Sequence, residues 1–322
     1  MAAVAAGPGN PLFEGLIRGP FAADKRSVRL ASAAVVLCAV VAFVTGCGGN
    51  VEKVTVADIE QAAFKTEGGG TARVSFKGEV TFNHDHGQRF EFRGAGLADF
   101  QTGSAKFRAV YKFPNAIQEA IKHEFGGPWK ANFILDGSDG IILYMRFPYL
   151  DGQLPRGKTW LKADIVEIGK RYGLDLDRLK ETRRSDPGVM LAYLKSAVGV
   201  RKVGTDLVRR EVATHYSSIV DAETIVEEAP KDQQRAMRKY LRLMGIKTYP
   251  VDLWVDRDGV VRKLGIELEY KLPDGEYVKM KVSEEYYDFG VEVDIKPPPA
   301  RRVLDVTPRF RTERHSPRRL TS

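Results

Sequence analysis

Alternation of apolar and polar residues recurs along this chain and restricts the folds that it can adopt. Between Ala72 and Phe82 every second residue is apolar or glycine, and a polar residue stands between each pair. The alternation returns over Ala105–Phe113 and Leu264–Tyr270. Because successive side chains of a β-strand point to opposite faces, each segment predicts a strand with one buried and one solvated face. Strands of this kind are typical of antiparallel sheets.

Turn sequences join several predicted strands into hairpins, and helical periodicity is confined to a few segments. Asn83–Gly87, Asp136–Gly140 and Asp256–Gly259 contain the residue types that tight turns favour. The segments that predict helices are Thr55–Lys65, Asp164–Tyr172, Pro187–Val198 and Lys231–Met244. Because strands and helices do not alternate, the sequence predicts an α+β fold with one long antiparallel sheet and helices over its apolar face.

The N-terminal segment has the composition of an export signal. A basic patch at Lys25–Arg29 precedes the uncharged run Leu30–Val44, which is shorter than the roughly 20 apolar residues that a membrane-spanning helix needs. Val44-Thr45-Gly46-Cys47 follows and resembles the bacterial lipobox, in which the cysteine receives a diacylglyceryl group before cleavage. The resemblance implies a signal peptide over residues 1–46, acyl chains such as palmitate on Cys47, and a flexible tether over 47–54. An ordinary signal that happens to contain a cysteine is the alternative.

Cysteine content and charge exclude several classes of function. The chain has two cysteines, Cys38 in the predicted signal and Cys47, so the exported domain has neither a thiolate nucleophile nor a cysteine metal site. The net charge of +8 is concentrated in residues 300–322, which contain seven arginines against Asp305 and Glu313. The domain before this tail is nearly neutral, which argues against a nucleic-acid-binding face. The tail is predicted to be disordered and outside the core, where it either attracts anionic headgroups or is an inert solvated end.

No motif in the chain predicts catalysis or metal binding. Gly-x-Ser-x-Gly, His-Glu-x-x-His and phosphate-loop patterns are absent. His84 and His86 stand in a predicted turn, where such residues are common without a metal. Asp252 and Asp256 are interpreted as strand-edge and turn residues, and His215 as a half-buried strand residue hydrogen-bonded within the sheet. We therefore expect no enzymatic activity, no cofactor and no metal.

The predicted apolar face of the sheet is larger than a few short helices can cover. Either bulky side chains fill the space above it, as periodicity alone favours, or part of the face lines a cavity for an apolar ligand. Small residues at Gly78, Ala105 and Ala109 favour a void, with the predicted helix Pro187–Val198 on its other side. The candidate lining residues are Phe107, Tyr111, Phe133, Met145, Met190, Leu191, Leu194, Leu264, Ile266 and Met280.

Several short segments, spread over most of the mature domain, match the pattern of a known family. They are Gly157–Lys162, Asp186–Leu194, Val203–Asp206, Val212–Tyr216, Asp221, Pro250–Asp256 and Gly259–Leu264. These segments resemble the LolA-like lipoproteins of actinobacteria, the group that includes LppX and LprG. The resemblance implies a strongly curved half-barrel with helices on its concave face, as a single domain over residues 55–299.

The same resemblance implies a class of function. Members of the group are envelope lipoproteins, so we expect a lipid-anchored protein on the extracytoplasmic face of the cell membrane. It would bind or carry a lipid or lipoglycan between sheet and helices, with envelope transport proteins as candidate partners and no role for nucleic acid. A closed surface domain that recruits or senses a protein partner, without ligand, is the alternative.

Overall fold

The computed structural model describes most of the predicted domain. The described residues are 70–82, 89–114, 128–138, 140–155, 157–171, 197–228, 231–271 and 277–310, with Ala62, Thr66, Gly68, Gln118, Glu119, Lys122 and His123. The predicted signal peptide, Cys47, the tether and the turn that contains His84 and His86 lie outside these residues. The predictions for those segments therefore stay predictions.

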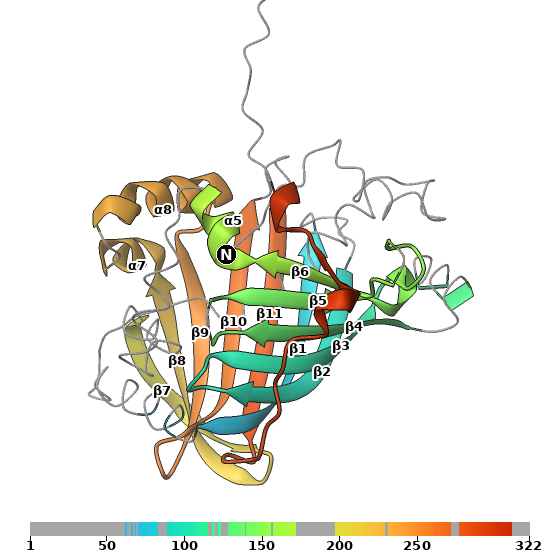
Figure 1. Cartoon of the computed structure of the whole chain (residues 1–322). Helices are drawn as coiled ribbons and strands as arrows, with labels where there is room; N and C mark the ends of the chain where they lie inside the picture. The colour runs from blue at the N-terminus through green and yellow to red at the C-terminus, as the bar shows by residue number, and fades with distance from the viewer. Residues whose placement is uncertain are drawn as a thin grey trace, which may run out of the picture.

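One sheet of twelve strands makes up most of the described fold (Figure 1). Its strand order is β12-β6-β5-β4-β3-β2-β1-β11-β10-β9-β8-β7. All neighbours pair antiparallel except β12 and β6, which are parallel. The strands are β1 Thr71–Phe82, β2 Arg89–Asp99, β3 Ser104–Lys112, β4 Trp129–Asp136, β5 Ile142–Arg146, β6 Trp160–Asp164, β7 Ala197–Val208, β8 Glu211–Asp221, β9 Thr248–Asp256, β10 Val261–Lys271, β11 Tyr277–Tyr287 and β12 Val303–Asp305.

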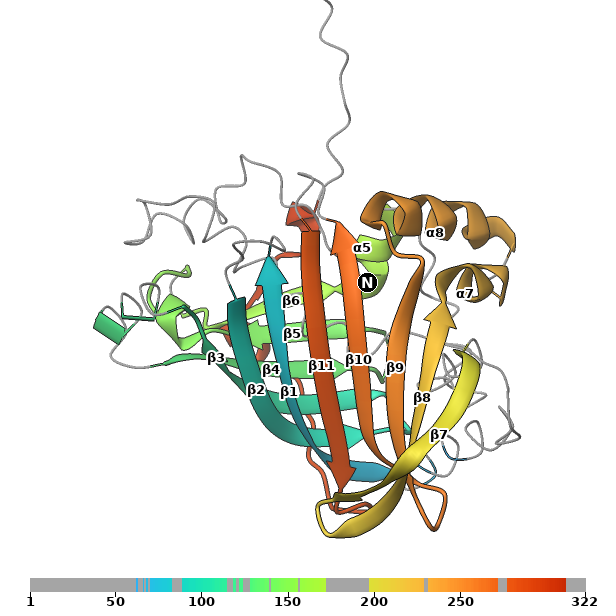
Figure 2. The same cartoon turned by 180° about the vertical axis from the view of Figure 1, so that it is seen from behind.

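The sheet is so strongly curved that its two halves face each other (Figures 1 and 2). Strands β2 to β6 form one half and β7 to β11 the other, and β1 joins them by pairing with both β2 and β11. Because β7 and β12 stand at opposite ends of the strand order, the sheet does not close on itself. The α+β class and the curved antiparallel half-barrel are therefore confirmed.

Three α-helices whose bounds the structure describes lie near one end of the sheet (Figure 1). They are α5 Ile165–Arg171, α7 Ala222–Glu228 and α8 Lys231–Met244. Helix α8 has the bounds that the sequence predicted. Helix α5 confirms the helix predicted over Asp164–Tyr172, and α7 was not predicted. Leu241 and Met244 of α8 are buried, and Met244 packs into the core cluster of the concave face. Helix α8 therefore contributes to covering that face.

The helix predicted over Pro187–Val198 is wrong at its C-terminal end. Ala197 and Val198 are the first residues of β7 and pair with β8. Their spacing from earlier apolar residues fitted a helical stripe, but strand pairing with a distant segment determines the conformation. The preceding part of the predicted helix, residues 187–196, lies outside the described chain.

The predicted disorder of the tail is wrong for residues 300–310. Strand β12 pairs with β6, and the Nζ atom of Lys162 lies 3.0 Å from the carboxylate of Asp305. Val306 is buried in the core, and its N–H donates a hydrogen bond to the Lys162 carbonyl at 2.9 Å. Strand β12 forms because the edge of β6 is available to pair with it. A strand of three residues is too short to show an alternation of apolar and polar residues, so the sequence analysis did not predict it. Residues 311–322 lie outside the described chain.

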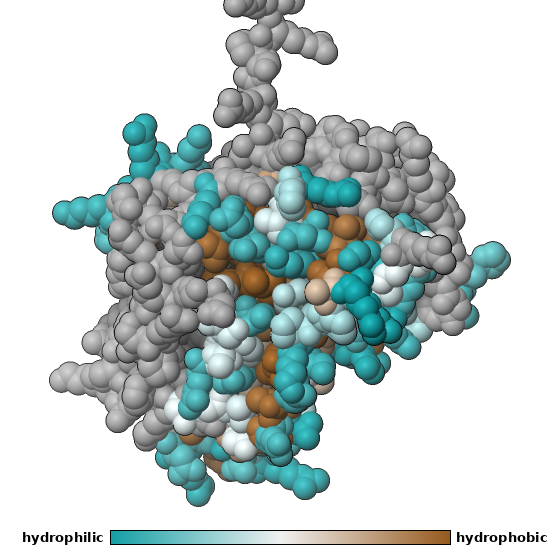
Figure 3. Space-filling view, in the orientation of Figure 1, coloured by the Kyte–Doolittle hydropathy of each residue, from teal (hydrophilic) through white to brown (hydrophobic). Residues whose placement is uncertain are grey.

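A strap of residues 290–299 leads from β11 to β12 and is drawn in front of the sheet in Figure 1. Half-buried and exposed residues alternate along it, which indicates that one of its sides lies against the protein. The outer face of β4 and β5 includes two buried side chains, Ile134 and Tyr144, which are paired. Figure 3 shows hydrophobic residues in small groups among hydrophilic ones on this side of the molecule. The outer face of the sheet is therefore not purely polar.

Candidate ligand-binding face

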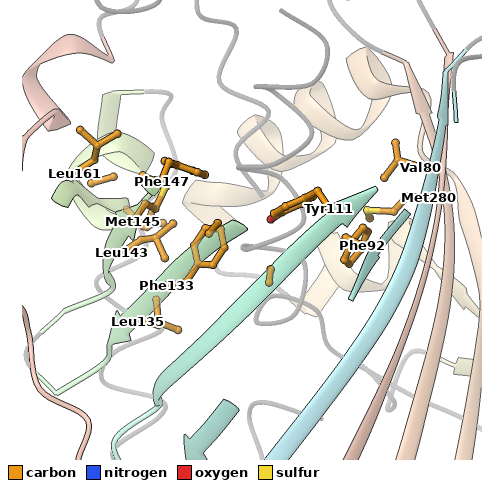
Figure 4. Close-up of a cluster of buried hydrophobic side chains, with 14 of the residues drawn as sticks. Val80, Phe92, Tyr111, Phe133, Leu135, Leu143, Met145, Phe147, Leu161 and Met280 are labelled. Atoms are coloured by element: carbon orange, nitrogen blue, oxygen red, sulfur yellow. The ribbon is translucent and has the colours of Figure 1, made fainter. Parts of the chain in front are cut away.

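Side chains that point into the curved sheet form one continuous apolar face (Figure 4). Val80, Tyr111, Phe133 and Met280 from four different strands all point into this space, and none is more than 2% exposed. Most polar residues of the same strands, such as Lys77 and Lys279, alternate with these residues and point outward. The alternation in the sequence is therefore the division between an inner apolar face and an outer polar face.

Aromatic rings cover the part of the inner face that β1 to β5 build. We call these residues the aromatic half: Phe76, Phe82, Phe90, Phe92, Phe107, Tyr111, Phe113, Trp129, Phe133, Phe147 and Tyr149. Ring centroids of neighbours are 5.4 Å apart for Phe76 and Phe107, 5.0 Å for Phe107 and Phe133, and 6.0 Å for Phe133 and Phe147. These distances are typical of favourable ring pairs, which add to the stability that burial alone supplies.

Glycines on this face make room for aromatic rings. A Cβ atom at Gly78 would lie 2.4 Å from the ring of Phe92, and one at Gly94 would lie 2.2 Å from the ring of Phe76. Each glycine is paired with that same phenylalanine on the neighbouring strand. The two alanines of β3 that we expected beside a void are likewise buried in the cluster. The interpretation of Gly78 as favouring a void is therefore wrong, because a cross-strand ring occupies the space above it.

A second cluster has a different composition; most of its residues come from β7 to β11, with others from the N-terminal segment, β1 and the end of β2. We call its buried residues the aliphatic half: Ala62, Ala72, Ala98, Phe100, Val200, Val220, Tyr249, Val251, Leu253, Val261, Leu264 and Tyr286. The hydroxyl of Thr66 accepts a hydrogen bond from the N–H of Val261 at 2.8 Å, which fixes the N-terminal segment to this half. Leu268 packs against both halves, so the two form one surface.

The structure places every described member of the predicted lining on the inner face. Those in or against the cluster of the aromatic half are Phe107, Tyr111, Phe133, Met145 and Met280. Those in or against the aliphatic half are Leu264 and Ile266. Those outside the described residues are Met190, Leu191 and Leu194. Contact between any of these residues and a ligand stays a prediction.

One residue of the inner face, Glu284 on β11, was missed by the sequence analysis. It shares the even-numbered positions of Val278 and Met280, and that parity is the signal that could have revealed it. The Glu284 side chain is 7% exposed, and the hydroxyl of Tyr286 donates a hydrogen bond to its Oε2 atom at 2.7 Å. Burial raises the pKa of Glu284 from 4.5 to about 7, and the hydrogen bond from Tyr286 opposes this shift.

A group of polar residues lies on the outer face of β7 to β10. The ring of His215 stacks on Trp254 at 4.2 Å, and its Nε2 atom is 2.9 Å from Oδ1 of Asp252. The indole Nε1 of Trp254 donates a hydrogen bond to Asp206 at 2.7 Å, and the Lys263 ammonium lies 3.8 Å from the Trp254 ring centre. His215 is the half-buried, hydrogen-bonded strand residue that we predicted. The hydrogen bond from Trp254 to Asp206 therefore links the edge strand β7 to β9.

Asp256 has the turn role that we predicted for it. Its carboxylate accepts hydrogen bonds from the N–H groups of Asp258 and Val260 and lies 2.5 Å from Nε of Arg262. Within the described residues, no three side chains of His, Cys, Asp or Glu are grouped so that they could hold a metal ion. In the same part of the chain, no helix combines the length and the apolar character that crossing a membrane requires.

The hairpin of β7 and β8 presents apolar side chains to solvent at the open edge of the sheet. They are Val203 (53% exposed), Leu207 (73%), Val212 (39%) and Ile219 (49%). In the turn of this hairpin, Nε of Arg209 lies 2.6 Å from Glu285, and the guanidinium lies 3.7 Å from the ring centre of Tyr287. The tip of the hairpin therefore rests on β11, while the apolar side chains stay exposed.

Comparisons with known proteins return one curated relative and several solved structures. No protein-family model matches the chain. The relative, from Streptomyces griseus, is described as an uncharacterized 31.2 kDa protein in the rplA-rplJ intergenic region. It is 25% identical over 257 residues, which cover 78% of each chain.

The solved structures include two mycobacterial lipoproteins. LppX from Mycobacterium tuberculosis is 13% identical, with 75% of this chain and 97% of that chain covered and a TM-score of 0.40. LprF from Mycobacterium bovis is 14% identical, with coverage of 76% and 96% and a TM-score of 0.36. A LolA superfamily protein from Nitrosomonas europaea is 8% identical, with coverage of 73% and 94% and a TM-score of 0.25. LppX is a member of the group that the sequence resembles.

Proposed function

We propose that this chain is a lipid-anchored envelope lipoprotein that binds or carries an apolar ligand, a lipid or lipoglycan, on the concave face of its sheet. The observation that supports this function best is the continuous apolar inner face of a sheet that does not close. Ligand sites are typically lined by apolar and aromatic side chains with a few polar groups among them, and this face has that composition. Because the described lining is buried, ligand entry requires these side chains to move apart.

The lipobox-like Cys47 supports the membrane anchor. Its acyl chains would hold the domain on the extracytoplasmic face of the cell membrane, since each buried CH₂ contributes roughly 0.8 kcal/mol. Envelope transport proteins are the candidate partners there, and we propose no enzymatic activity. The variant Cys47→Ala should accumulate uncleaved or as a soluble exported protein, which membrane fractionation measures. A fully processed Cys47→Ala chain in the membrane fraction would contradict the assignment.

Native mass spectrometry of the unacylated chain, exported with a signal peptide that lacks a lipobox, tests ligand binding. Ile266→Trp adds volume at a half-buried inner position of β10 and should lower the ligand-bound fraction several-fold. Glu269→Trp is the matched control, since it places the same ring on the exposed outer face of that strand. Equal occupancy in the two variants, or an unmodified chain that carries no ligand, would contradict the carrier function.

The exposed hairpin of β7 and β8 favours the second candidate, a closed surface domain that recruits or senses a protein partner. Two of its exposed apolar residues, Leu207 and Val212, are paired across the hairpin, and exposed apolar groups of this kind can mark interaction sites. The ring above Gly78 also agrees with a closed core. If this second function is correct, Leu207→Ser should weaken partner capture from envelope extracts, and the unmodified chain should contain no lipid. The carrier function predicts that Ile266→Trp, not Leu207→Ser, changes lipid occupancy.

A further inference from the structure

Glu284 is an acidic residue buried among apolar side chains. In the described part of the chain, it is the only acidic or basic residue that is buried as a whole; the similarly buried carboxylate of Asp256 belongs to a turn and is ion-paired with Arg262. It is paired with Phe76 on β1 and Leu264 on β10, so hydrophobic side chains flank it on both neighbouring strands. Other charged residues of these strands, such as Lys263, stand at positions of the opposite parity and face outward. Arg262, beside the register shift at the start of β10, is ion-paired with Asp256.

The hydrogen-bonding capacity of this carboxyl is only partly used. Among the described residues, the hydroxyl of Tyr286 is the one group that hydrogen-bonds it. A carboxyl group has two oxygen atoms that can together accept several hydrogen bonds, and its protonated form can also donate one. Glu284 already accepts one hydrogen bond, from Tyr286, and the carboxyl group retains the capacity for another. A polar group of a bound ligand could use that capacity.

The chemistry of Glu284 and Tyr286 indicates which kind of ligand group they would bind. Because the pKa of Glu284 is about 7, both of its protonation states are populated near neutral pH. A hydroxyl group can donate to the carboxylate and can accept from the carboxylic acid, so it suits both states. An ammonium group would bring a second charge into an apolar surface, and a phosphate would be repelled by the carboxylate.

We propose that Glu284 and Tyr286 form a polar subsite that binds a hydroxyl group of a long-chain ligand. The preferred ligand class is then a neutral hydroxyl-bearing amphiphile, such as a long-chain alcohol or an acylglycerol. The inference rests on the proposed function, because it names a polar contact within the same concave face. The long chain would lie against the apolar residues on either side of the pair.

Binding of hexadecanol and hexadecane to the unacylated chain, followed by native mass spectrometry, tests the subsite. The two probes differ only in one hydroxyl group, so the ratio of their affinities isolates its contribution. We expect the alcohol to bind about tenfold more tightly than the alkane, as one hydrogen bond to a buried partner supplies. Glu284→Leu should reduce this preference to less than about twofold while alkane binding persists. The control Glu269→Leu makes the same exchange on the exposed outer face of β10 and should keep the full preference.

Glu284→Leu removes a buried ionisable group, so we expect it to fold at least as well as the unmodified chain. If it does not fold, Glu284→Gln and Tyr286→Phe provide the test. The amide should retain most of the preference for the alcohol, whereas loss of the tyrosine hydroxyl should weaken it.

Three outcomes would overturn the proposal, and they are distinguishable. Equal binding of both probes by the unmodified chain overturns the subsite and leaves the carrier function intact. A preference that persists in Glu284→Leu overturns the assignment to Glu284. A chain that binds neither probe and contains no co-purified lipid contradicts the carrier function itself.

Discussion

The two halves of the concave face are both apolar, yet they are built differently. In the aromatic half, rings lie over glycines of the next strand and contact one another across neighbouring strands. In the aliphatic half, the buried carboxyl of Glu284 accepts a hydrogen bond from Tyr286 and is paired with Leu264 on one neighbouring strand and Phe76 on the other. The comparison indicates that one half supplies close packing, while the other contains the polar group that could distinguish one ligand from another.

The two halves also differ in the chain terminus that completes them. Val306 from the C-terminal segment is buried with the aromatic half, and Leu304 and Phe310 pack against the same cluster. Ala62 from the N-terminal segment is buried in the aliphatic half. Each half of the core therefore depends on a segment that lies outside the main run of strands.

The largest expected effect comes from removing a ring of the aromatic half. Phe133 is 1% exposed and contacts the rings of Phe107 and Phe147. Phe133→Ala should lower the free energy of unfolding by about 3–5 kcal/mol, because a large cavity replaces a buried ring. Leu253→Ala in the aliphatic half, also 1% exposed, should cost about 2–5 kcal/mol and tests whether the halves differ. Denaturant titration measures both values. A cost below about 1 kcal/mol for Phe133→Ala would show that the aromatic half is loosely packed.

The next effect comes from removing the segment that completes the aromatic half. A chain that ends at Pro299 loses the pairing of β12 with β6 and the burial of Val306. Burial of one such side chain and one or two hydrogen bonds together contribute about 2–4 kcal/mol, which should appear as a lower midpoint in thermal and chemical unfolding. A chain that ends at Phe310 is the control, since it retains the described contacts of this segment. Equal stability of the two truncated chains would show that β12 is dispensable.

The smallest of the three effects concerns the aliphatic half and depends on pH. Below about pH 4.5 Glu284 is protonated in the folded and unfolded states alike. Between pH 4.5 and about 7 the unfolded state loses the proton while the folded state retains it, so stability should fall as the pH rises. The expected loss is roughly 2–3 kcal/mol, and above pH 7 it should level off.

Glu284→Gln should remove this component, which the difference in free energy of unfolding between the two proteins at pH 4.5 and pH 8 would measure. If that difference is independent of pH, the carboxyl is solvated in the folded protein. The aliphatic half would then be no more polar than the aromatic half.

Local patterns of the sequence determined most of the sheet. The alternation over Ala72–Phe82 became β1 with the predicted inner residues, and the periodicity over Lys231–Met244 became α8 with the predicted bounds. These elements could be predicted because the spacing of their apolar residues already matches the geometry of the face that they bury. The predicted lining residues within the described chain lie on the inner face for the same reason.

Contacts between distant segments decided the rest. Val303–Asp305 is a strand only because the edge of β6 is available to it, and Ala197 is extended because β8 pairs with it. The space above Gly78 is filled because the neighbouring strand places Phe92 there. The parity of Glu284 with Met280 indicates only that its side chain points inward; its burial, and so its raised pKa, comes from strands β1 and β10 on either side. Local periodicity determines which residues can face inward, but only the assembled sheet determines what each inward residue meets.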